Sequence, residues 1–308
     1  IENHVNFSCE ASVGGGIPIL MPLHQSLAAN QIESIVGILN GTTNYILSQM
    51  TETGVNYANA LADAQKQGFA EADPTNDVCG FDAARKLAIL SSIGFRANVT
   101  FDDVLVEGIE KIDKSDIQYA KDMGYTIKLL TVALRQENGI ALNVYPAFLP
   151  DNHPLSSVKG AYNAIYVTGN IVDDVMFYGR GAGALPTASA VMGDVISTAQ
   201  HILNGSTGTG MIMTDTKRIP FYSSLKLQNS YYFRLDVDDV TGVLSQIAAA
   251  FAENDISICE VVQKRKTKGL AELVLITELA SRESILQVEK GLQVLPCMRK
   301  VANVIRVM

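Results

Sequence analysis

The stretch FDAARKLAILSSIG (residues 81–94) is apolar on almost every side of a helix. A helix that is apolar all round lies in the interior of a protein. Its only ionisable residues, Asp82, Arg85 and Lys86, fall within one turn. Asp82 and Lys86 are four residues apart with the acid before the base, so they share a face in the favourable order. The sequence therefore predicts a buried helix with a charged start that ends near Gly94.

Strand patterns follow this helix along the chain. YTIKLLTVAL and IALNVYPAFL (125–134 and 140–149) flank the turn Asn138-Gly139, which is a strong hairpin signal. AIYVTG and VDDVMFYG predict a second strand pair around Gly169-Asn170. Further helices are predicted at Thr42–Thr53, Tyr57–Gln67 and Pro186–Leu203. Helices that cover a mixed sheet with hairpins make the expected fold class α+β.

The C-terminal part has a pattern of its own. DTKRIPFYSSLKLQNS (215–230) is polar and contains a proline, which is typical of a connector. The segments after it predict strand, helix, two strands joined by the turn KTKG (266–269), helix and strand. The order βαββαβ is the ferredoxin-like arrangement. We therefore expect a first domain over 1–215, a linker over 216–228 and a second domain over 229–308.

The composition limits the classes of function. A chain of 308 residues can form two domains, and 47% hydrophobic with 18% charged residues suits a globular protein. The net charge of −8 argues against nucleic acid or an anionic membrane as the main partner, because both repel an acidic surface. No apolar run reaches the roughly 20 residues that span a bilayer. Cys9, Cys79, Cys259 and Cys297 form no paired motif, which favours reduced cysteines and a cytoplasmic location.

The charged start of the 81–94 helix allows several interpretations. A buried, unpaired ammonium costs several kcal/mol, so Lys86 needs a partner, a solvent cleft or a reaction. Glu71, Asp73 and Asp77 lie just upstream. With Asp82 they could take the ammonium of a zwitterion while the cations take its carboxylate. The residues alone favour a capped, salt-bridged helix start. A Schiff-base lyase built on Lys86 is a third hypothesis.

Four segments in register resemble one family. They are ILNGTTNYIL (38–47), GFAEADPTNDVCGFDAARKLAIL (68–90), EASVGGGIPIL (10–20) and GRGAGALPTASAVMGDVI (179–196). Together they are similar to the homoserine dehydrogenases, and the match contains several uncommon residue choices in the right order. The resemblance implies an NAD(P)-dependent oxidoreductase that interconverts L-aspartate 4-semialdehyde and L-homoserine. That reaction belongs to threonine, methionine and isoleucine biosynthesis.

The resemblance also implies roles for individual residues. Lys86 is the catalytic lysine that helps to move the proton on the substrate hydroxyl, a role that a buried lysine can fill. Hydride comes from a nicotinamide, since no side chain supplies it, and NADP is the usual coenzyme of the family. The residues expected to bind substrate are Glu71, Asp82, Asp77, Thr42 and Gly41. The residues expected to contact the coenzyme are Gly68 and Gly183.

EASVGGGIP is similar to the family's monovalent cation site. Glu10 would give its carboxylate, and Val13, Gly15 and Ile17 their carbonyls. Ligation by oxygen alone suits a hard ion such as sodium. A plain turn with one partly buried glutamate explains the same residues.

The family opens with a βαβ unit and a GxGxxG turn for the pyrophosphate. No such segment precedes Ile1 in this sequence, and the family's second active-site lysine lies in that unit. We therefore expect most of the coenzyme-binding domain to lie outside these residues, and we expect this polypeptide alone to show no oxidation of homoserine. A non-catalytic fragment that binds amino acid and oligomerises is the alternative.

LDVDDVTGVLSQIAAAFAENDISI (235–258) resembles an ACT domain. That resemblance implies a regulatory amino acid, with threonine as the leading candidate, near Asp239 and Gly242. A purely structural dimerisation module is the other interpretation, because topology alone does not imply an effector. RNA-binding modules share the topology, but no aromatic-rich strand is present. A homodimer or homotetramer is expected.

Overall fold

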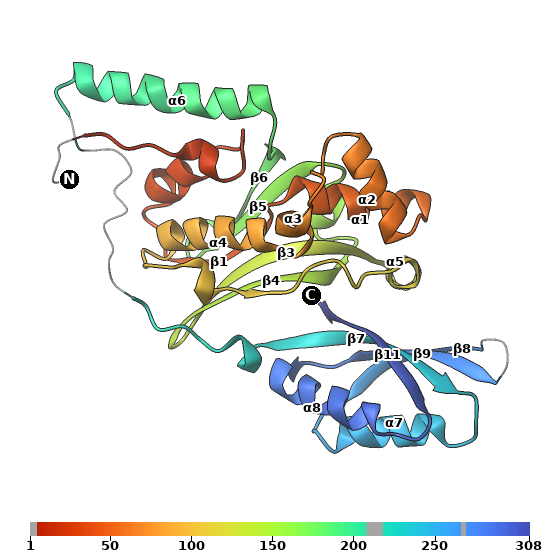
Figure 1. Cartoon of the computed structure of the whole chain (residues 1–308). Coiled ribbons are helices and arrows are strands. Elements are labelled where there is room, and N and C mark those ends of the chain that lie inside the picture. Colours follow the sequence, from red (N-terminus) through yellow and green to blue (C-terminus); the bar gives the residue numbers. More distant parts are fainter. Residues whose placement is uncertain (1–4, 207, 209–217, 266–268) are drawn as a thin grey trace.

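The computed structural model describes residues 5–206, 208, 218–265 and 269–308. Strands from both halves of the chain form one mixed sheet in the order β6-β5-β1-β3-β4-β11-β7-β9-β8, with helices against it (Figure 1). The predicted α+β class is confirmed.

The first half contains β1 (Ile32–Ile38), α1 (Gly41–Thr53), α2 (Tyr57–Lys66), α3 (Thr75–Val78), α4 (Phe81–Gly94), β2 (Leu105–Val106), α5 (Lys114–Asp122), β3 (Tyr125–Gln136), β4 (Gly139–Pro150), β5 (Tyr162–Gly169), β6 (Asp173–Arg180) and α6 (Ala184–Leu203). The second half contains β7 (Gln228–Asp238), α7 (Val243–Ala252), β8 (Ile258–Arg265), β9 (Leu270–Thr277), β10 (Ala280–Ser281), α8 (Arg282–Gln293) and β11 (Met298–Val307).

The four helices predicted in the first half are all present, with ends that shift by at most two residues. The sequence pattern did not predict β1 or α5. β1 joins β3 and β5, antiparallel to both, so it lies in the middle of the first half of the sheet. α5 begins at a capping box in which Asp113 accepts hydrogen bonds from Ser115 and Asp116 backbone N–H groups. That box was a readable start signal.

The hairpin of β3 and β4 is confirmed, but its turn differs by one residue. Gln136 pairs with Gly139, so Glu137 and Asn138 form the turn and Gly139 is already in β4. A Cβ atom on Gly139 would lie 2.1 Å from the carbonyl oxygen of Pro220. Glycine is needed there because another backbone segment passes close by, which the sequence pattern did not reveal.

The second half has the predicted βαββαβ order; within the KTKG turn, residues 266–268 lie outside the described residues. Its last strand, β11, also pairs in parallel with β4 of the first half, with Arg306 opposite Ala147 and Val307 opposite Phe148. The two halves thus share one sheet, which continues across the predicted linker. The domain boundaries themselves stay a prediction.

A buried cluster of charged side chains connects α5 to the second half of the chain. The strand period of two sends Phe233 and Leu235 towards α7 and α8, and Arg234 towards α5. Arg234 pairs with Asp116 at 2.8 Å and with Asp113 and Glu272, and its own side chain is 6% exposed. Burial acts to lower the pKa of Arg234, but the hydrogen bonds and charge of Asp116 outweigh burial and raise it. Asp116 is fully buried, so this guanidinium is what compensates its charge.

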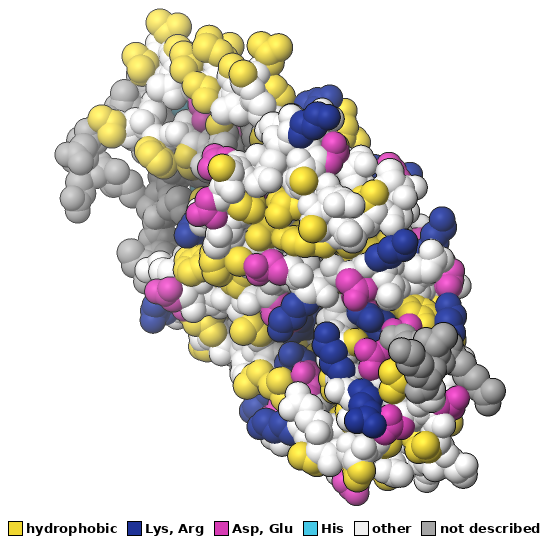
Figure 2. Space-filling view, turned by 45° about the vertical axis from the view of Figure 1, so that its right-hand side comes forward, with side chains coloured by type: hydrophobic (Ala, Val, Ile, Leu, Met, Phe, Trp, Pro, Cys, Tyr) yellow, Lys and Arg dark blue, Asp and Glu magenta, His cyan; other side chains and the backbone are white. Residues whose placement is uncertain are grey.

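α6 is unlike the other long helices because none of its residues is buried. It extends away from the sheet at the top of Figure 1, and apolar side chains cover its surface at the upper left of Figure 2. Its exposed large apolar residues are Leu185, Val191, Met192, Val195, Ile196, Ile202 and Leu203. Among the described residues, no helix has the length and apolar content needed to cross a bilayer.

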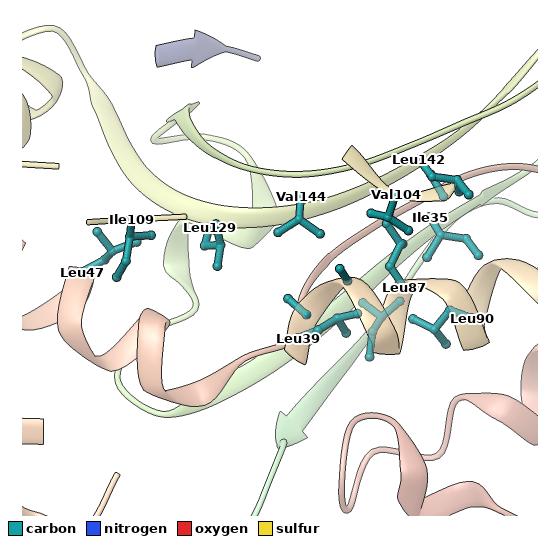
Figure 3. Packing of buried hydrophobic residues seen from close by; sticks show 14 of the residues in the cluster. Ile35, Leu39, Leu47, Leu87, Leu90, Val104, Ile109, Leu129, Leu142 and Val144 are labelled. Atoms are coloured by element: carbon teal, nitrogen blue, oxygen red, sulfur yellow. The ribbon is translucent and has the colours of Figure 1, made fainter. Parts of the chain in front are cut away.

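α4 lies in the main hydrophobic core, as its composition predicts. Leu87 and Leu90 are fully buried and belong to the same core cluster as Ile35, Leu142 and Val144 of the sheet (Figure 3). Burying each of these side chains contributes about 1.5–3 kcal/mol. This packing fixes the orientation of α4, and therefore the direction in which its polar first turn points.

Candidate active site

A cavity of about 480 Å³ opens beside the first turns of α1 and α4. Its walls come from segments that are far apart in the sequence. They are Asn40, Gly41, Thr42, Gly68, Phe69, Asp77, Asp82, Lys86, Ala161, Arg180, Gly181, Ala182, Gly183 and Pro186. Seven of the eight residues predicted to serve catalysis, substrate or coenzyme therefore line one space. Glu71 is the exception: it lies in the exposed loop after α2 and is not part of this lining.

Lys86 and Asp82 form an ion pair in this cavity, as their spacing predicts. Lys86 Nζ lies 2.6 Å from Asp82 Oδ2 and donates a second hydrogen bond to the Leu39 carbonyl at 3.1 Å. The two side chains are 21% and 32% exposed, so the pair sits at the boundary between core and solvent. An ion-paired ammonium can donate a proton but is a poor nucleophile, which does not favour the Schiff-base hypothesis.

Asn40 is hydrogen-bonded to two acidic residues of the cavity, and it was not among the predicted site residues. Its Nδ2 donates to Asp77 Oδ1 at 2.6 Å and to Asp82 Oδ2 at 2.9 Å. Its Oδ1 accepts from the Thr43 backbone N–H at 2.8 Å, so Asn40 is the N-cap of α1. An asparagine just before a helical pattern is a start signal, and that signal could have found it. Asn40 therefore sets both the start of α1 and the spacing of the two carboxylates.

The loop after α2 supplies another wall. Thr42 Oγ1 donates to the Phe69 carbonyl at 2.6 Å and so ties this loop to α1. Gly68 has φ of +76°, a conformation that favours glycine, and its Cα faces open space. At this point the cavity is lined by backbone atoms of Gly68, with no side chain between them and a ligand.

The thiol of Cys79 is held in its neutral form by its surroundings. Cys79 follows α3 and donates to Glu110 Oε2 at 3.2 Å. Burial, with this hydrogen bond to a carboxylate, raises the pKa of the Cys79 thiol to about 11. This raised pKa disfavours the thiolate, which is the reactive form of a cysteine.

The glycine loop before α6 completes the cavity. Gly183 has φ of +119° and precedes α6 without a side-chain cap, so the first backbone N–H groups of a 20-residue helix are open at this end. Arg180 stacks over the Tyr162 ring at 4.9 Å. Helix N-termini with free N–H groups attract negative or electron-rich atoms. The loop thus offers main-chain donors beside a guanidinium.

The predicted cation segment lies against the same loop. A Cβ on Gly15 would be 2.4 Å from the Gly181 carbonyl oxygen, so the two glycine turns touch. The carboxylate of Glu10 is fixed by backbone donors, and its predicted role as a cation ligand stays a prediction. It accepts hydrogen bonds from the backbone N–H groups of Ile19, Leu20 and Met21, and thereby caps the following helical turn. Within the described residues no group of three or more His, Cys, Asp or Glu side chains could hold a metal ion.

Asp239 and Gly242 lie at the predicted turn before α7. Gly242 has φ of +89° and nothing within 4 Å of the position of a Cβ atom. The Asp239 backbone N–H donates to the Gly269 carbonyl at 2.8 Å, which ties this turn to the start of β9. The turn is therefore fixed in place and open to a small ligand on the glycine side.

Comparison with known proteins agrees with this geometry. The sequence matches the homoserine dehydrogenase family over residues 18–196 and the ACT domain family over residues 231–297. It is 44% identical over 313 residues to homoserine dehydrogenase of Mycobacterium tuberculosis, a match that covers 98% of this chain and 70% of the relative. It is 40% identical to the enzyme of Bacillus subtilis, covering 99% of this chain and 71% of that protein.

Solved structures give the same result. The crystal structure of a homoserine dehydrogenase from Thiobacillus denitrificans superposes with a TM-score of 0.92 at 36% identity, covering 98% of this chain and 70% of that one. A hyperthermophilic archaeal homoserine dehydrogenase mutant in complex with NADPH superposes with a TM-score of 0.56 at 28% identity, over 65% of this chain and 57% of that one. The chain therefore belongs to the homoserine dehydrogenase family, the NAD(P)-dependent oxidoreductases of amino-acid biosynthesis, and it carries an ACT domain.

Proposed function

We propose that the cavity binds homoserine and aspartate 4-semialdehyde, and that Lys86 moves the proton on the substrate oxygen. The observation that carries this proposal is the Lys86–Asp82 ion pair of 2.6 Å inside a cavity of suitable size. Lys86 can take the hydroxyl proton of homoserine in one direction and return it to the developing alkoxide in the other. Asp82 positions the Lys86 amino group, which accepts the hydroxyl proton as a neutral amine and returns it as an ammonium in the opposite direction.

The charges around the cavity suit a zwitterionic amino acid. Asp77 and Asp82 are held side by side by Asn40 and can accept hydrogen bonds from a substrate ammonium. Lys86 and Arg180 supply positive charge for a carboxylate or a polarised oxygen. Glu71 would join this set from the rim, as a carboxylate on a loop next to the cavity. Thr42 and Gly41 would shape the wall.

The glycine positions fit a nicotinamide coenzyme. Gly68 and Gly183 both present backbone without a side chain to the cavity, and the free N–H groups at the start of α6 suit its polar carboxamide. When bound, the coenzyme supplies or accepts the hydride that no side chain can provide. We propose NADP in preference to NAD, because a relative of similar fold is described in complex with NADPH.

For the cation, we propose a site built from main-chain carbonyls of Val13, Gly15 and Ile17 near Glu10. None of these three carbonyls accepts a hydrogen bond from another described residue. Oxygen ligands of this kind suit sodium, and titration of the thermal midpoint with NaCl against KCl measures its binding. The Glu10 carboxylate would give the site a fourth ligand, while its hydrogen bonds to Ile19, Leu20 and Met21 fix the helical turn that follows.

Homoserine binding tests the assignment of the carboxylates. We expect Asp77→Asn to weaken binding about tenfold or more, because hydrogen bonds to charged groups contribute about 1.5–3 kcal/mol. Glu71→Gln should weaken it by a smaller factor, since an exposed carboxylate is screened by solvent. Titration calorimetry with L-homoserine provides the measurement.

The control for this comparison is Glu33→Gln, which makes the same change of charge at an exposed position in β1. Its affinity should equal that of the wild-type protein. Wild-type affinity in Asp77→Asn would contradict the proposed substrate site.

For regulation, we propose that threonine binds at the turn of Asp239 and Gly242. We expect Gly242→Ala to reduce threonine affinity at least about tenfold, since the added methyl group strains the left-handed backbone and occupies the open side of the turn. Gly54→Ala is the matched control, because Gly54 has φ of +69° and equally open surroundings at the end of α1. Wild-type threonine affinity in Gly242→Ala would contradict this site, and a folded, oligomeric wild-type protein that binds no threonine would make the ACT domain purely structural.

The exposed apolar surface of α6 supports association with further protein. A row of seven large apolar side chains in water is unusual for a monomer. We therefore keep the prediction of a homodimer or homotetramer, which light scattering on purified protein measures.

A further inference from the structure

Lys128 is a buried lysine in the middle of β3, and its side chain is 2% exposed. Its Nζ donates to Asn44 Oδ1 at 3.0 Å and to the Val158 carbonyl. Both partners are neutral. The charged groups that act on it, Lys159 and Glu52, pair with each other on the surface at 3.4 Å. Burial, reinforced by Lys159, lowers the pKa of Lys128 to about 8. An ammonium is costly in such a place, so it has to contribute something that an apolar side chain cannot.

Asn44 carries the effect of Lys128 to a neighbouring segment. It lies on α1 and is 1% exposed. Its Nδ2 donates to three main-chain carbonyls of residues 158–162, those of Val158 at 3.2 Å, Gly160 at 2.9 Å and Tyr162 at 3.1 Å. An ammonium can only donate, so Lys128 holds the Oδ1 atom and thereby keeps Nδ2 turned towards the segment. The Gly160 backbone N–H adds a bond to Ser48 Oγ at 3.0 Å.

Residues 158–162, here called the wall segment, form part of the substrate cavity. Ala161 lines the cavity next to Gly41. The approach is close: a Cβ on Gly41 would lie 3.0 Å from the Ala161 carbonyl oxygen. Tyr162, at the other end of the segment, stacks under Arg180, which also lines the cavity. The position of the wall segment therefore sets the width of the cavity and the place of one of its two cations.

We propose that Lys128 is a positioning residue for substrate binding: with Asn44 it fixes the wall segment, and through it Ala161 and Arg180, at the distance that homoserine requires. The inference rests on the proposed substrate cavity and names the device that maintains its shape. Lys128 itself contacts neither substrate nor coenzyme. The charged side chain of the wall segment, Lys159, is 70% exposed and pairs with Glu52, so the Asn44 amide, oriented by Lys128, supplies donors to three of the segment's main-chain carbonyls.

Removal of the ammonium should loosen the wall segment without unfolding the chain. Lys128→Met keeps most of the volume but removes the ammonium that donates to Asn44 Oδ1, and it leaves the Val158 carbonyl with the Asn44 amide as its donor. We expect homoserine affinity by calorimetry to fall about tenfold, and the KM for homoserine in the full-length polypeptide to rise by a similar factor. The KM for the coenzyme should stay within about twofold. Hydrogen exchange of a peptide covering 155–163 should become faster, while that of α4 stays unchanged.

Three companion variants make the test specific. Lys128→Gln keeps a donor and should recover part of the affinity. Asn44→Leu removes the link itself, and the double variant with Lys128→Met should be no weaker in binding than Asn44→Leu alone, because both act through one contact. Lys159→Met removes a nearby but exposed lysine, 70% exposed, and should leave homoserine binding as in the wild-type protein.

Two results would overturn the proposal. Lys128→Met could bind homoserine like the wild-type protein while its thermal midpoint falls, which would make the lysine purely structural. Equal increases in the KM for homoserine and for coenzyme would show a general loss of order. If Lys128→Met does not fold, Lys128→Gln decides the same question. A wild-type protein that binds no homoserine would instead contradict the proposed function, so the two failures are distinguishable.

Discussion

Replacement of Lys86 by methionine should lower kcat for homoserine oxidation in the full-length polypeptide by about 10²–10⁴-fold. This is the range that a positioned general base or acid contributes. Methionine keeps an aliphatic side chain of similar length at this position of α4, where Leu87 and Leu90 of the same helix are fully buried. The loss should therefore appear in kcat, with a small change in the KM for homoserine. Initial rates of coenzyme reduction at saturating homoserine measure it.

A matched variant and a second substitution sharpen this test. Lys66→Met changes an exposed lysine in the last turn of α2 and should leave kcat unchanged. Asp82→Asn removes the ionic partner at 2.6 Å but leaves the Leu39 carbonyl, so its kcat should fall less than that of Lys86→Met. A Lys86→Met enzyme that turns over within about threefold of the wild-type rate would refute the assigned role.

The largest effect on stability is expected at the junction of the two halves. Arg234→Met should reduce the free energy of unfolding by about 3–5 kcal/mol, the cost of leaving a buried charge without its partner. The uncompensated group is Asp116, which has no exposed surface and also accepts from Tyr232 at 3.2 Å and Asn303 at 2.7 Å. Urea denaturation followed by circular dichroism gives the value.

Two further variants separate charge from packing at this junction. Asp116→Asn in the Arg234→Met background should recover part of the lost stability, because a neutral amide is cheaper to bury than a carboxylate. Arg299→Met is the surface counterpart: its bidentate pair with Asp238 is 60% exposed on the arginine side, so its loss should lower the free energy of unfolding far less than Arg234→Met does. Equal losses for Arg234 and Arg299 would contradict the importance of burial.

Local pattern was enough to predict much of the fold and part of the site. The 81–94 helix, its buried face and the Asp82–Lys86 pair all follow from helical spacing, because the interacting groups are neighbours on one helix. The βαββαβ half followed from alternating strands and amphipathic helices. Gly68 and Gly183 were placed by the family resemblance, and the cavity brings them together with Lys86.

What the sequence could not supply depends on contacts between distant segments. Lys128 reads as one polar residue in an apolar strand, and only the fold shows that Asn44 and a loop thirty residues downstream surround it. The sequence pattern did not predict that the Glu10 carboxylate accepts hydrogen bonds from three backbone N–H groups. Gly139 was assigned to a turn for its conformational freedom, and its actual constraint is the passage of Pro220. In each case the residue's role depends on a contact with a distant segment of the chain, and local sequence pattern does not predict such contacts.

The parallel pairing of β4 with β11 has a consequence for biosynthesis. Beyond Val144, where β2 stops pairing with it, the free edge of β4 is completed by a strand that the ribosome makes only after the whole ACT half. Until then, the nascent first half exposes unpaired backbone N–H and C=O groups beside apolar residues such as Phe148, a surface prone to aggregate. Pairings between segments so far apart also form slowly. The ACT half therefore supplies, through β11, the strand that covers the edge of β4 once synthesis of the chain is complete. This contribution to folding is independent of any ligand that the ACT half binds.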